Sequence, residues 1–318
     1  MGEHLPVSTM SDSRIGENLA PIVQQSCHGR LSHINWFRTT WQRGGASTGY
    51  ASYTDEGDVV EPVVVKVPVN PTELLWLQQL QSTPDLVPKL FACGSTLGPY
   101  DLAWVVMERL PHGPLGSPWN GSEFDLLIEA ACRFYQASQG QAVTLPLPAK
   151  NWGLLLDKAR KHIAEDHDVP HEQRWKNALK KAQKKLPQWL GVWNNRPQNH
   201  WVHGDLHLAN ALSRHPAPHG PAILIDFAQV HSGHWVEDAV YLEHLFWARK
   251  QRLGHRKLVS QLAHQRHALG LVVEHDWPIL ASIKRALLAM TTPAMLDYDG
   301  DPQYVQAALE VLEHEVGL

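Results

Sequence analysis

The chain has 318 residues, which is long enough for two lobes or domains that each bury a core. Apolar residues make up 43% of the sequence and charged residues 19%, which is the composition of a globular protein. The formal net charge of -4 argues against nucleic-acid binding by bulk charge, and no apolar run approaches the roughly 20 residues that a membrane span needs.

The N-terminal segment and the cysteines both indicate a cytoplasmic protein. The first residues contain Glu3, Asp12 and Glu17 and lack an apolar core, so we expect a loose arm over residues 1–20 and no signal peptide. Three cysteines lie far apart, are odd in number and lack metal-site spacing: Cys27, Cys93 and Cys132. Free thiols in a reducing compartment fit this pattern best.

The first third of the chain has the composition of β structure. Runs of β-branched and aromatic residues predict strands over residues 31–41, 50–54, 63–69 and 102–107. A helix is predicted from Asn70-Pro71 onward, with one face formed by leucines 74, 77 and 80. Prolines and glycines over residues 111–118 then break the pattern, and we place the lobe boundary there.

Beyond this boundary the apolar period becomes helical. Ser122 is a candidate N-cap of one helix. Further helices are predicted over residues 154–163, 175–190, 236–250, 257–269, 279–290 and 304–316. A short apolar run ends at Val202, and a strand is predicted over residues 222–225. The pattern therefore predicts an α+β fold, with a small antiparallel β lobe followed by a larger, mostly helical lobe.

The segment from His203 to Asn210, with the later Ile225-Asp226-Phe227, carries the strongest functional signal. Phosphoryl transfer from ATP needs one carboxylate that accepts or orients the proton of the attacking hydroxyl, and Mg²⁺ ligands that hold the phosphates. Mg²⁺ prefers hard oxygen ligands and keeps several waters, so one Asp and one Asn suffice. We therefore interpret Asp205 as the base, Asn210 as a metal ligand and Asp226 as the main metal ligand.

The spacing His-x-Asp-Leu-x-x-x-Asn, followed by Asp-Phe, matches the protein-kinase catalytic loop and metal motif. Gly204, with Gly233 and Asp238 downstream, resembles instead the aminoglycoside phosphotransferase and choline-kinase families. The resemblance implies a protein kinase-like two-lobed fold with five strands in the N-lobe (21–110) and the catalytic loop in the C-lobe (111–318). It further implies that Asp238 lies early in a helix and holds the backbone of the catalytic loop. His203 is interpreted as a structural residue of that loop.

Lys66 interrupts an otherwise apolar strand, where an ammonium group is costly without a partner. The kinase fold that the resemblance implies offers two partners, the nucleotide phosphates and a helix carboxylate. Glu73, with Leu77 and Leu80 after it, matches the corresponding helix of the family. Lys66 and Glu73 are therefore expected to bind the nucleotide as a pair, although a glutamate at a helix start is also common for dipole reasons alone.

Two further segments are candidates for nucleotide contacts. The turn at residues 43–49 could offer backbone N–H groups and hydroxyls to phosphate, although loose hairpin turns of this composition are common. Its candidate ligands are Gly44, Gly45, Ser47 and Thr48. By resemblance, backbone groups around Glu108 and Leu110 would read the adenine edge.

These observations predict an enzyme, a small-molecule kinase that uses Mg²⁺ and ATP (or GTP) to phosphorylate a hydroxyl group. Its expected partner is a small-molecule acceptor, with no nucleic acid or membrane, and the chain is expected to be a monomer or homodimer. Two alternatives stay open. One is a catalytically inactive nucleotide-binding relative. The other is a metal-dependent hydrolase, if His203, Asp205 and His207 point the same way on a strand.

Overall fold

The structure, a computed structural model, describes residues 11–37, 46–116, 121–141, 150–165, 169–295 and 301–318. The chain forms two compact units, one comprising Met1–Leu126 with Leu208–Val230 and the other Leu127–His207 with His231–Leu318. No helix within the described residues is long and apolar enough to cross a membrane.

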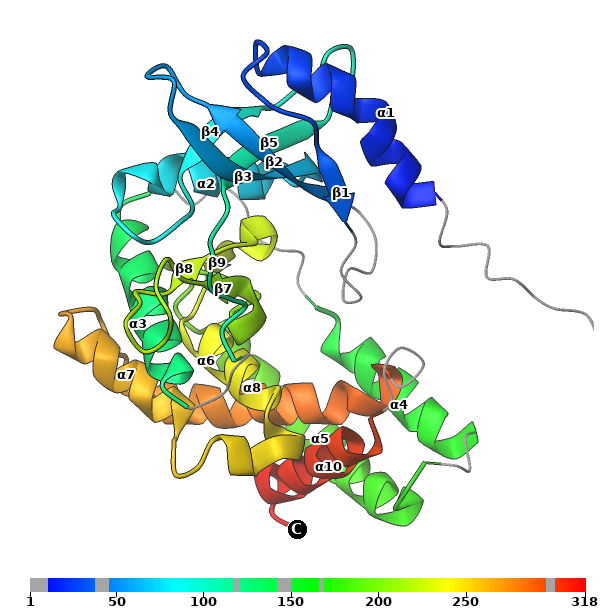
Figure 1. The fold of residues 1–318 in the computed structure, drawn as a ribbon. Coiled ribbons are helices and arrows are strands. Elements are labelled where there is room, and N and C mark those ends of the chain that lie inside the picture. The colour runs from blue at the N-terminus through cyan, green and yellow to red at the C-terminus, as the bar shows by residue number, and fades with distance from the viewer. Residues whose placement is uncertain (1–10, 38–45, 117–120, 142–149, 166–168, 296–300) are drawn as a thin grey trace, which may run out of the picture. The chain divides into compact units, whose positions relative to one another are not determined.

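The first unit is built on a five-stranded antiparallel sheet with the strand order β1-β2-β3-β5-β4 (Figure 1). The strands are β1 (Asn35–Phe37), β2 (Ser47–Thr54), β3 (Val60–Val69), β4 (Leu90–Gly94) and β5 (Ala103–Glu108). In β3, Val63, Val65 and Val67 are fully buried on one face, while Lys66 lies on the other. This alternation fixes which side chains of the sheet face the core.

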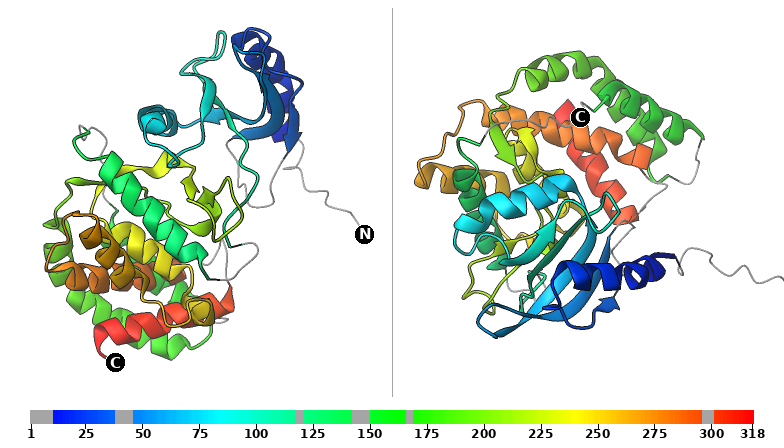
Figure 2. Two further views of the ribbon diagram at one scale, coloured as in Figure 1. Left: turned by 60° about the vertical axis from the view of Figure 1, so that its left-hand side comes forward. Right: turned by 90° about the horizontal axis from the view of Figure 1, so that it is seen from above.

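Helix α1 (Ser11–Ser26) packs on the core face of this sheet (Figures 1 and 2). The expectation of a loose arm over residues 1–20 is therefore wrong for residues 11–20, which belong to this helix. Its apolar stripe contains Leu19 and Val23 and is continued by Cys27 just after the helix; these residues are spaced four apart and buried with the valines of β3. Glu17, one of the acidic residues that suggested an arm, lies at an exposed position beside this stripe.

A second segment of the chain completes the first unit. It contains the 3₁₀ turn η2 (Leu208–Asn210), strands β7 (Ala211–Leu212) and β8 (Ile223–Leu224), and the 3₁₀ turn η3 (Phe227–Gln229). The Leu224 N–H donates to the Leu86 carbonyl at 2.9 Å, and the Leu115 N–H donates to the Ala211 carbonyl at 2.8 Å. These bonds join residues 208–230 and 111–116 to the sheet unit, so its extent differs from the predicted N-lobe of residues 21–110.

The second unit is mostly helical, with one short ladder between β6 (His200–Val202) and β9 (His231–Gly233). Helices α5, α8 and α10 pack against one another (Figure 2). Its helical elements are α3 (Glu123–Ala137), α4 (Trp152–Glu165), α5 (Glu172–Asn194), α6 (Val236–His244), η4 (Trp247–Arg252), α7 (Leu258–Ala268), α8 (Trp277–Thr291), η5 (Thr292–Met295) and α10 (Pro302–Val316). The predicted helices are present, except that the one over 236–250 ends at His244 and continues as a 3₁₀ segment.

Candidate active site

Lys66 and Glu73 form a buried ion pair in the first unit. Lys66 Nζ lies 2.7 Å from Glu73 Oε1 and 2.8 Å from Oε2. Helix α2 (Pro71–Gln79) starts one residue after β3, with the Asn70 side chain accepting the Thr72 N–H at 2.8 Å and Pro71 in its first turn. This abrupt start places Glu73 in the first turn, opposite the strand lysine. The predicted contact between Lys66 and Glu73 is confirmed.

Burial decides the electrostatics of this pair. Glu73 is only 2% exposed, and this burial raises the pKa of its carboxyl above the ordinary value. The positive charge of Lys66 acts against this shift, while the carboxylate of Asp226 adds to it. Lys66 is therefore the group that favours the charged form of Glu73.

Asp226 is the second carboxylate near Lys66, with Oδ1 at 3.7 Å from Nζ. Its backbone is left-handed, with φ 63° and ψ 63°, a conformation that few residues other than glycine adopt and in which aspartate is enriched. The side chain is 42% exposed, in contrast to the buried Glu73. One carboxylate thus holds the lysine from inside the fold, and the other leaves oxygen surface for a ligand.

Asn210 and Asp226 lie at the same end of the β7–β8 ladder. Ala211 pairs with Leu224, and the Ile225 N–H donates to the Asn210 carbonyl at 3.0 Å. Asp226 is the next residue. The antiparallel register therefore brings one amide and one carboxylate side chain to one edge, which is a donor set that suits Mg²⁺.

Two residues of the predicted phosphate-binding turn, Ser47 and Thr48, lie on opposite faces of the sheet. Thr48 pairs with Lys66 across β2 and β3, and directly paired residues share a face, so Thr48 lies on the Lys66 face. Ser47 pairs with the core-facing Val67, and its Cβ lies 3.1 Å from the position of a Cβ built on Gly16 of α1. A contact between the Ser47 hydroxyl and a ligand beside Lys66 is therefore not supported. Gly44 and Gly45 lie outside the described residues.

Glu108 is tied into the fold by both its backbone and its side chain. Its N–H donates to the Lys89 carbonyl at 2.8 Å, so this donor is not available to an adenine ring. Arg214 binds the carboxylate in a bidentate manner, at 2.7 Å from Nε and 2.6 Å from Nη2. Burial acts to raise the pKa of this carboxyl, but the hydrogen bond from Arg214 helps to hold it below its ordinary value. Of the predicted adenine contacts, those from the Glu108 carbonyl and from Leu110 stay predictions.

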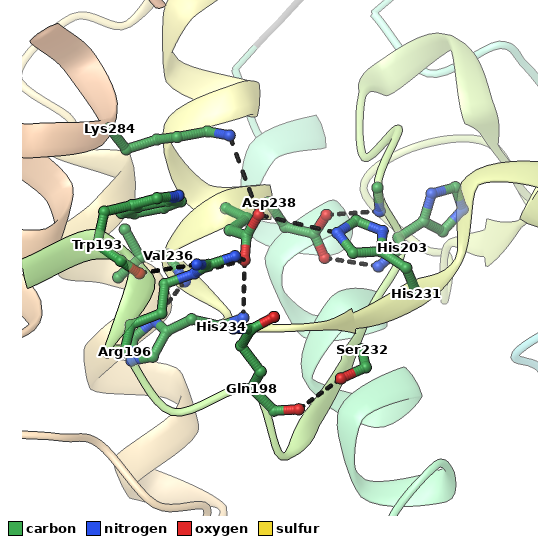
Figure 3. Close-up of polar contacts among 12 residues, drawn as sticks. Trp193, Arg196, Gln198, His203, His231, Ser232, His234, Val236, Asp238 and Lys284 are labelled. Carbon is green, nitrogen blue, oxygen red and sulfur yellow. Dashed lines mark hydrogen bonds and ion pairs between the residues drawn. The ribbon is translucent and has the colours of Figure 1, made fainter. Parts of the chain in front are cut away.

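In the second unit, Asp238 clamps the backbone of the catalytic loop (Figure 3). Its carboxylate is 1% exposed and accepts the N–H of His203 and the N–H of Gly204, both at 2.8 Å. The Tyr135 hydroxyl donates to the same carboxylate at 2.9 Å. Gly204 has a φ of 80°, which favours glycine at this turn. The predicted role of Asp238, early in α6 and holding the loop, is confirmed.

His203 has the structural role that the sequence indicated. Its ring is fully buried, and Nδ1 accepts the N–H of Asp205 at 3.3 Å. Strand β6 ends at Val202, so His203, Asp205 and His207 do not alternate along a strand as the hydrolase alternative requires. Among the described residues, no group of three or more His, Cys, Asp or Glu side chains is arranged to hold a metal ion.

Asp205 itself is partly exposed, and its Oδ1 contacts the side chains of Tyr241 and His207. The Tyr241 hydroxyl donates to it at 2.6 Å, and His207 Nε2 lies 3.4 Å away. Tyr241 was not predicted as a site residue from the sequence. The signal that could have found it is its position three residues after Asp238, on the same face of α6.

Glu237, next to Asp238, anchors the start of α6 to its surroundings. It accepts from the Arg196 guanidinium at 2.9 Å and from the His234 N–H at 3.0 Å, and Lys284 Nζ lies at 4.0 Å. Burial acts to raise the pKa of this carboxyl, but His231, Lys284 and Arg196 hold it far below its ordinary value. Burial also lowers the pKa of Lys284 to about 8.

The sequence matches the model of a known protein family. The Phosphotransferase enzyme family model matches residues 52–281, which include Lys66, Glu73, Asp205, Asp226 and Asp238. The chain belongs to this family. No curated protein matches the sequence.

Solved structures agree on the fold. A protein from Ralstonia eutropha JMP134, described as a candidate aminoglycoside phosphotransferase, is 17% identical with a TM-score of 0.58, covering 95% of this chain and 97% of its own. The microcompartment-associated aminopropanol kinase is 16% identical with a TM-score of 0.57, covering 94% and 95%. Spectinomycin phosphotransferase, solved with ADP and spectinomycin, is 10% identical with a TM-score of 0.57, covering 94% and 93%. The α+β, protein kinase-like two-lobed fold is thereby confirmed.

The buried pair gives a first prediction, on stability. Lys66→Ala leaves Glu73 buried without its cation, so we expect the first unit to lose roughly 3–5 kcal/mol of stability at neutral pH. The loss should shrink as the pH falls, because a protonated Glu73 no longer needs a positive partner. Urea unfolding at several pH values measures both effects. The control is Lys176→Ala in the exposed Lys176–Glu172 pair, where we expect a loss below about 1 kcal/mol.

A second prediction concerns the clamp on the loop. Asp238→Asn replaces one of the two accepting oxygens with an NH₂ group, so a backbone N–H of the loop loses its acceptor. Because losing a buried hydrogen bond costs on the order of 1–3 kcal/mol, amide exchange at His203 and Gly204 should become roughly tenfold faster or more. Hydrogen exchange measured by NMR tests this. Asp157→Asn, at an exposed position of α4, is the control, and equal protection in both variants would contradict the clamp.

Proposed function

We propose that the chain is an ATP- and Mg²⁺-dependent kinase that phosphorylates a hydroxyl group of a small molecule. The observation that carries the proposal is Lys66, held between the buried Glu73 and the exposed Asp226. An ammonium group fixed in this way, beside a carboxylate that can bind a metal, suits the phosphates of a nucleotide. A competition experiment between ATP and GTP distinguishes the two nucleotides as phosphate donors.

The donor and metal sites are argued from the first unit. Lys66 would bind phosphate oxygens, and Glu73 would position Lys66 from behind. Thr48 shares the Lys66 face and could donate its hydroxyl to phosphate. Asn210 and Asp226 would hold Mg²⁺, which when bound neutralises charge on the phosphates. The ADP in the spectinomycin phosphotransferase structure supports a nucleotide as the donor in this fold.

The proposed base is Asp205. The acceptor oxygen forms a bond to the γ-phosphorus while the bond from that phosphorus to the β-phosphate bridging oxygen breaks, and Asp205 takes the hydroxyl proton. The clamp by Asp238 supports this role, because a base must be held in place to act. The requirement that Asp205, Asn210, Asp226 and Lys66 converge on one cleft stays a prediction.

The acceptor is proposed by class. Spectinomycin and aminopropanol, named for two proteins of this fold, are both small amino compounds that carry hydroxyl groups. We propose an acceptor of this class, with neither nucleic acid nor membrane as partner. A cytoplasmic location is proposed because the described cysteines Cys27, Cys93 and Cys132 are all free, as expected in a reducing compartment.

The test of the base is Asp205→Asn. Because a positioned general base contributes about 10²–10⁴-fold, kcat should fall by that factor while nucleotide binding stays normal. Turnover of Mg·ATP across a panel of amino alcohols and amino sugars, together with nucleotide titration, measures both. A variant that keeps the wild-type rate would show that the base is another group. A wild-type chain that binds Mg·ATP and turns over none would favour the inactive relative.

The metal ligands are ranked by a second test. Asp226→Ala should weaken Mg²⁺-dependent nucleotide binding more than Asn210→Ala, because a carboxylate is the stronger hard ligand. Nucleotide affinity is measured with and without Mg²⁺ for each variant. Without the metal the ranking should vanish or reverse, since removing Asp226 also removes a negative charge near the phosphates. Equal losses in both variants with Mg²⁺ would overturn the ranking.

A further inference from the structure

Helix α6 holds the catalytic loop at two points in the second unit. Asp238, in its first turn, binds the backbone N–H groups of His203 and Gly204. One turn later, the Tyr241 hydroxyl donates to Asp205 Oδ1 at 2.6 Å. Residues three apart on a helix lie on the same face. The same face of α6 therefore fixes both the path of the loop and the side chain of the proposed base.

We propose that Tyr241 is a positioning residue, which orients the Asp205 carboxylate toward the acceptor hydroxyl. The proposal rests on the proposed function. A phenol that donates to a carboxylate at this distance forms a strong, charge-assisted hydrogen bond. Since it binds Oδ1, it sets the rotation of the carboxylate and with it the direction of Oδ2.

The chemical state of Tyr241 suits this role. Burial, the hydrogen bond to Asp205 and the charge of Asp205 all raise the pKa of the phenol, so it stays a donor at any physiological pH. Among the described residues, His207 of the same loop is a second titratable group at Asp205 Oδ1, with Nε2 at 3.4 Å. The carboxylate oxygen is thus approached by the helix on one side and by its own loop on the other.

Tyr241 is itself held in place by its surroundings. Its ring packs against His244, one turn further along α6, with ring centroids 4.8 Å apart, and against His207 at 6.4 Å. Burial lowers the pKa of His244 to about 4, so at neutral pH this neighbour adds no positive charge. The Glu237 network fixes the start of the helix that carries these residues. A fixed phenol on a fixed helix is what a positioning role requires.

The matched control is Tyr304→Phe. The Tyr304 ring lies in the same aromatic cluster, 6.2 Å from His244 and 6.1 Å from Trp247, and its hydroxyl interacts with Thr292. This substitution removes one phenol oxygen, as Tyr241→Phe does, at a residue whose described contacts do not include Asp205. Differences between the two variants therefore report the contact with Asp205.

The first arm of the test needs no turnover. In chain labelled with ¹³C at the aspartate carboxyl carbons, the Asp205 signal is assigned by its loss in Asp205→Asn. Tyr241→Phe should move its titration upward by about one pH unit, because the charged form loses a donor. Tyr304→Phe should leave it in place. An unmoved Asp205 titration in Tyr241→Phe overturns the proposal.

The second arm measures kcat and KM with Mg·ATP, using an acceptor identified in the panel or water. Tyr241→Phe should lower kcat roughly 10- to 100-fold and leave the KM for ATP unchanged, whereas Tyr304→Phe keeps the wild-type kcat. An equal or higher kcat in Tyr241→Phe would mean that the contact restrains the base, and it overturns the positioning role. A wild-type chain without any turnover counts against the proposed function, while the titration still decides the contact.

Discussion

The arrangement of the first unit depends on one constraint, that a buried carboxylate needs a cation. Glu73 is almost fully buried, and only Lys66 favours its charged form. For Lys66 to reach Glu73, strand β3 must carry the lysine on the face away from its valines. Helix α2 must also start within one residue of the strand. Asp226, just after β8, is the second carboxylate that contacts Lys66. The pair thus links a strand and the helix that directly follows it to Asp226, which is distant in sequence.

In the second unit, two adjacent carboxylates on α6 are also stabilised by hydrogen-bond donors. Neighbouring helix residues point about 100° apart, so Glu237 and Asp238 face different partners. Asp238 receives neutral N–H and O–H donors from the loop and Tyr135. Glu237 receives charged donors, with Arg196 from the end of α5 and Lys284 from α8. One carboxylate therefore orders the loop that contains the proposed base, while the other fastens the helix to the helical core.

The sequence could predict those site residues that break a local pattern. Lys66 was visible because an ammonium group in an apolar strand demands a partner, and Asp205, Asn210 and Asp226 because their spacing suits a metal and a base. Contacts that depend on folding were not visible. Arg214 reaches Glu108 across 106 residues, and Tyr241 is an ordinary helix residue until the loop is placed beside it. The face of Ser47 depended on a strand register that its sequence leaves open.

The helices and strands show the same difference between local signals, which the sequence carries, and features that depend on folding. The buried valines of β3 and the helix after Asn70-Pro71 have strong local signals, and both are present. Helix α1 was missed because polar residues such as the exposed Glu17 obscured the stripe of Leu19 and Val23, which becomes apolar packing only once the sheet exists. The end of α6 was missed because the apolar period continues past His244, whereas the backbone tightens there into a 3₁₀ segment.

Tyr241 connects Asp205 to a cluster of aromatic side chains. Its ring packs on His244, and His244 packs on Trp247 and Tyr304, so a single aromatic cluster extends from the residue that touches Asp205. Close-packed rings move together, because a change in the volume of one displaces its neighbours. A substitution in this cluster that changed the volume of a ring would therefore also shift the phenol that contacts Asp205. Under the proposed role of Tyr241, such a substitution would lower the rate of transfer, whereas Tyr304→Phe removes only a hydroxyl group from the cluster and would not.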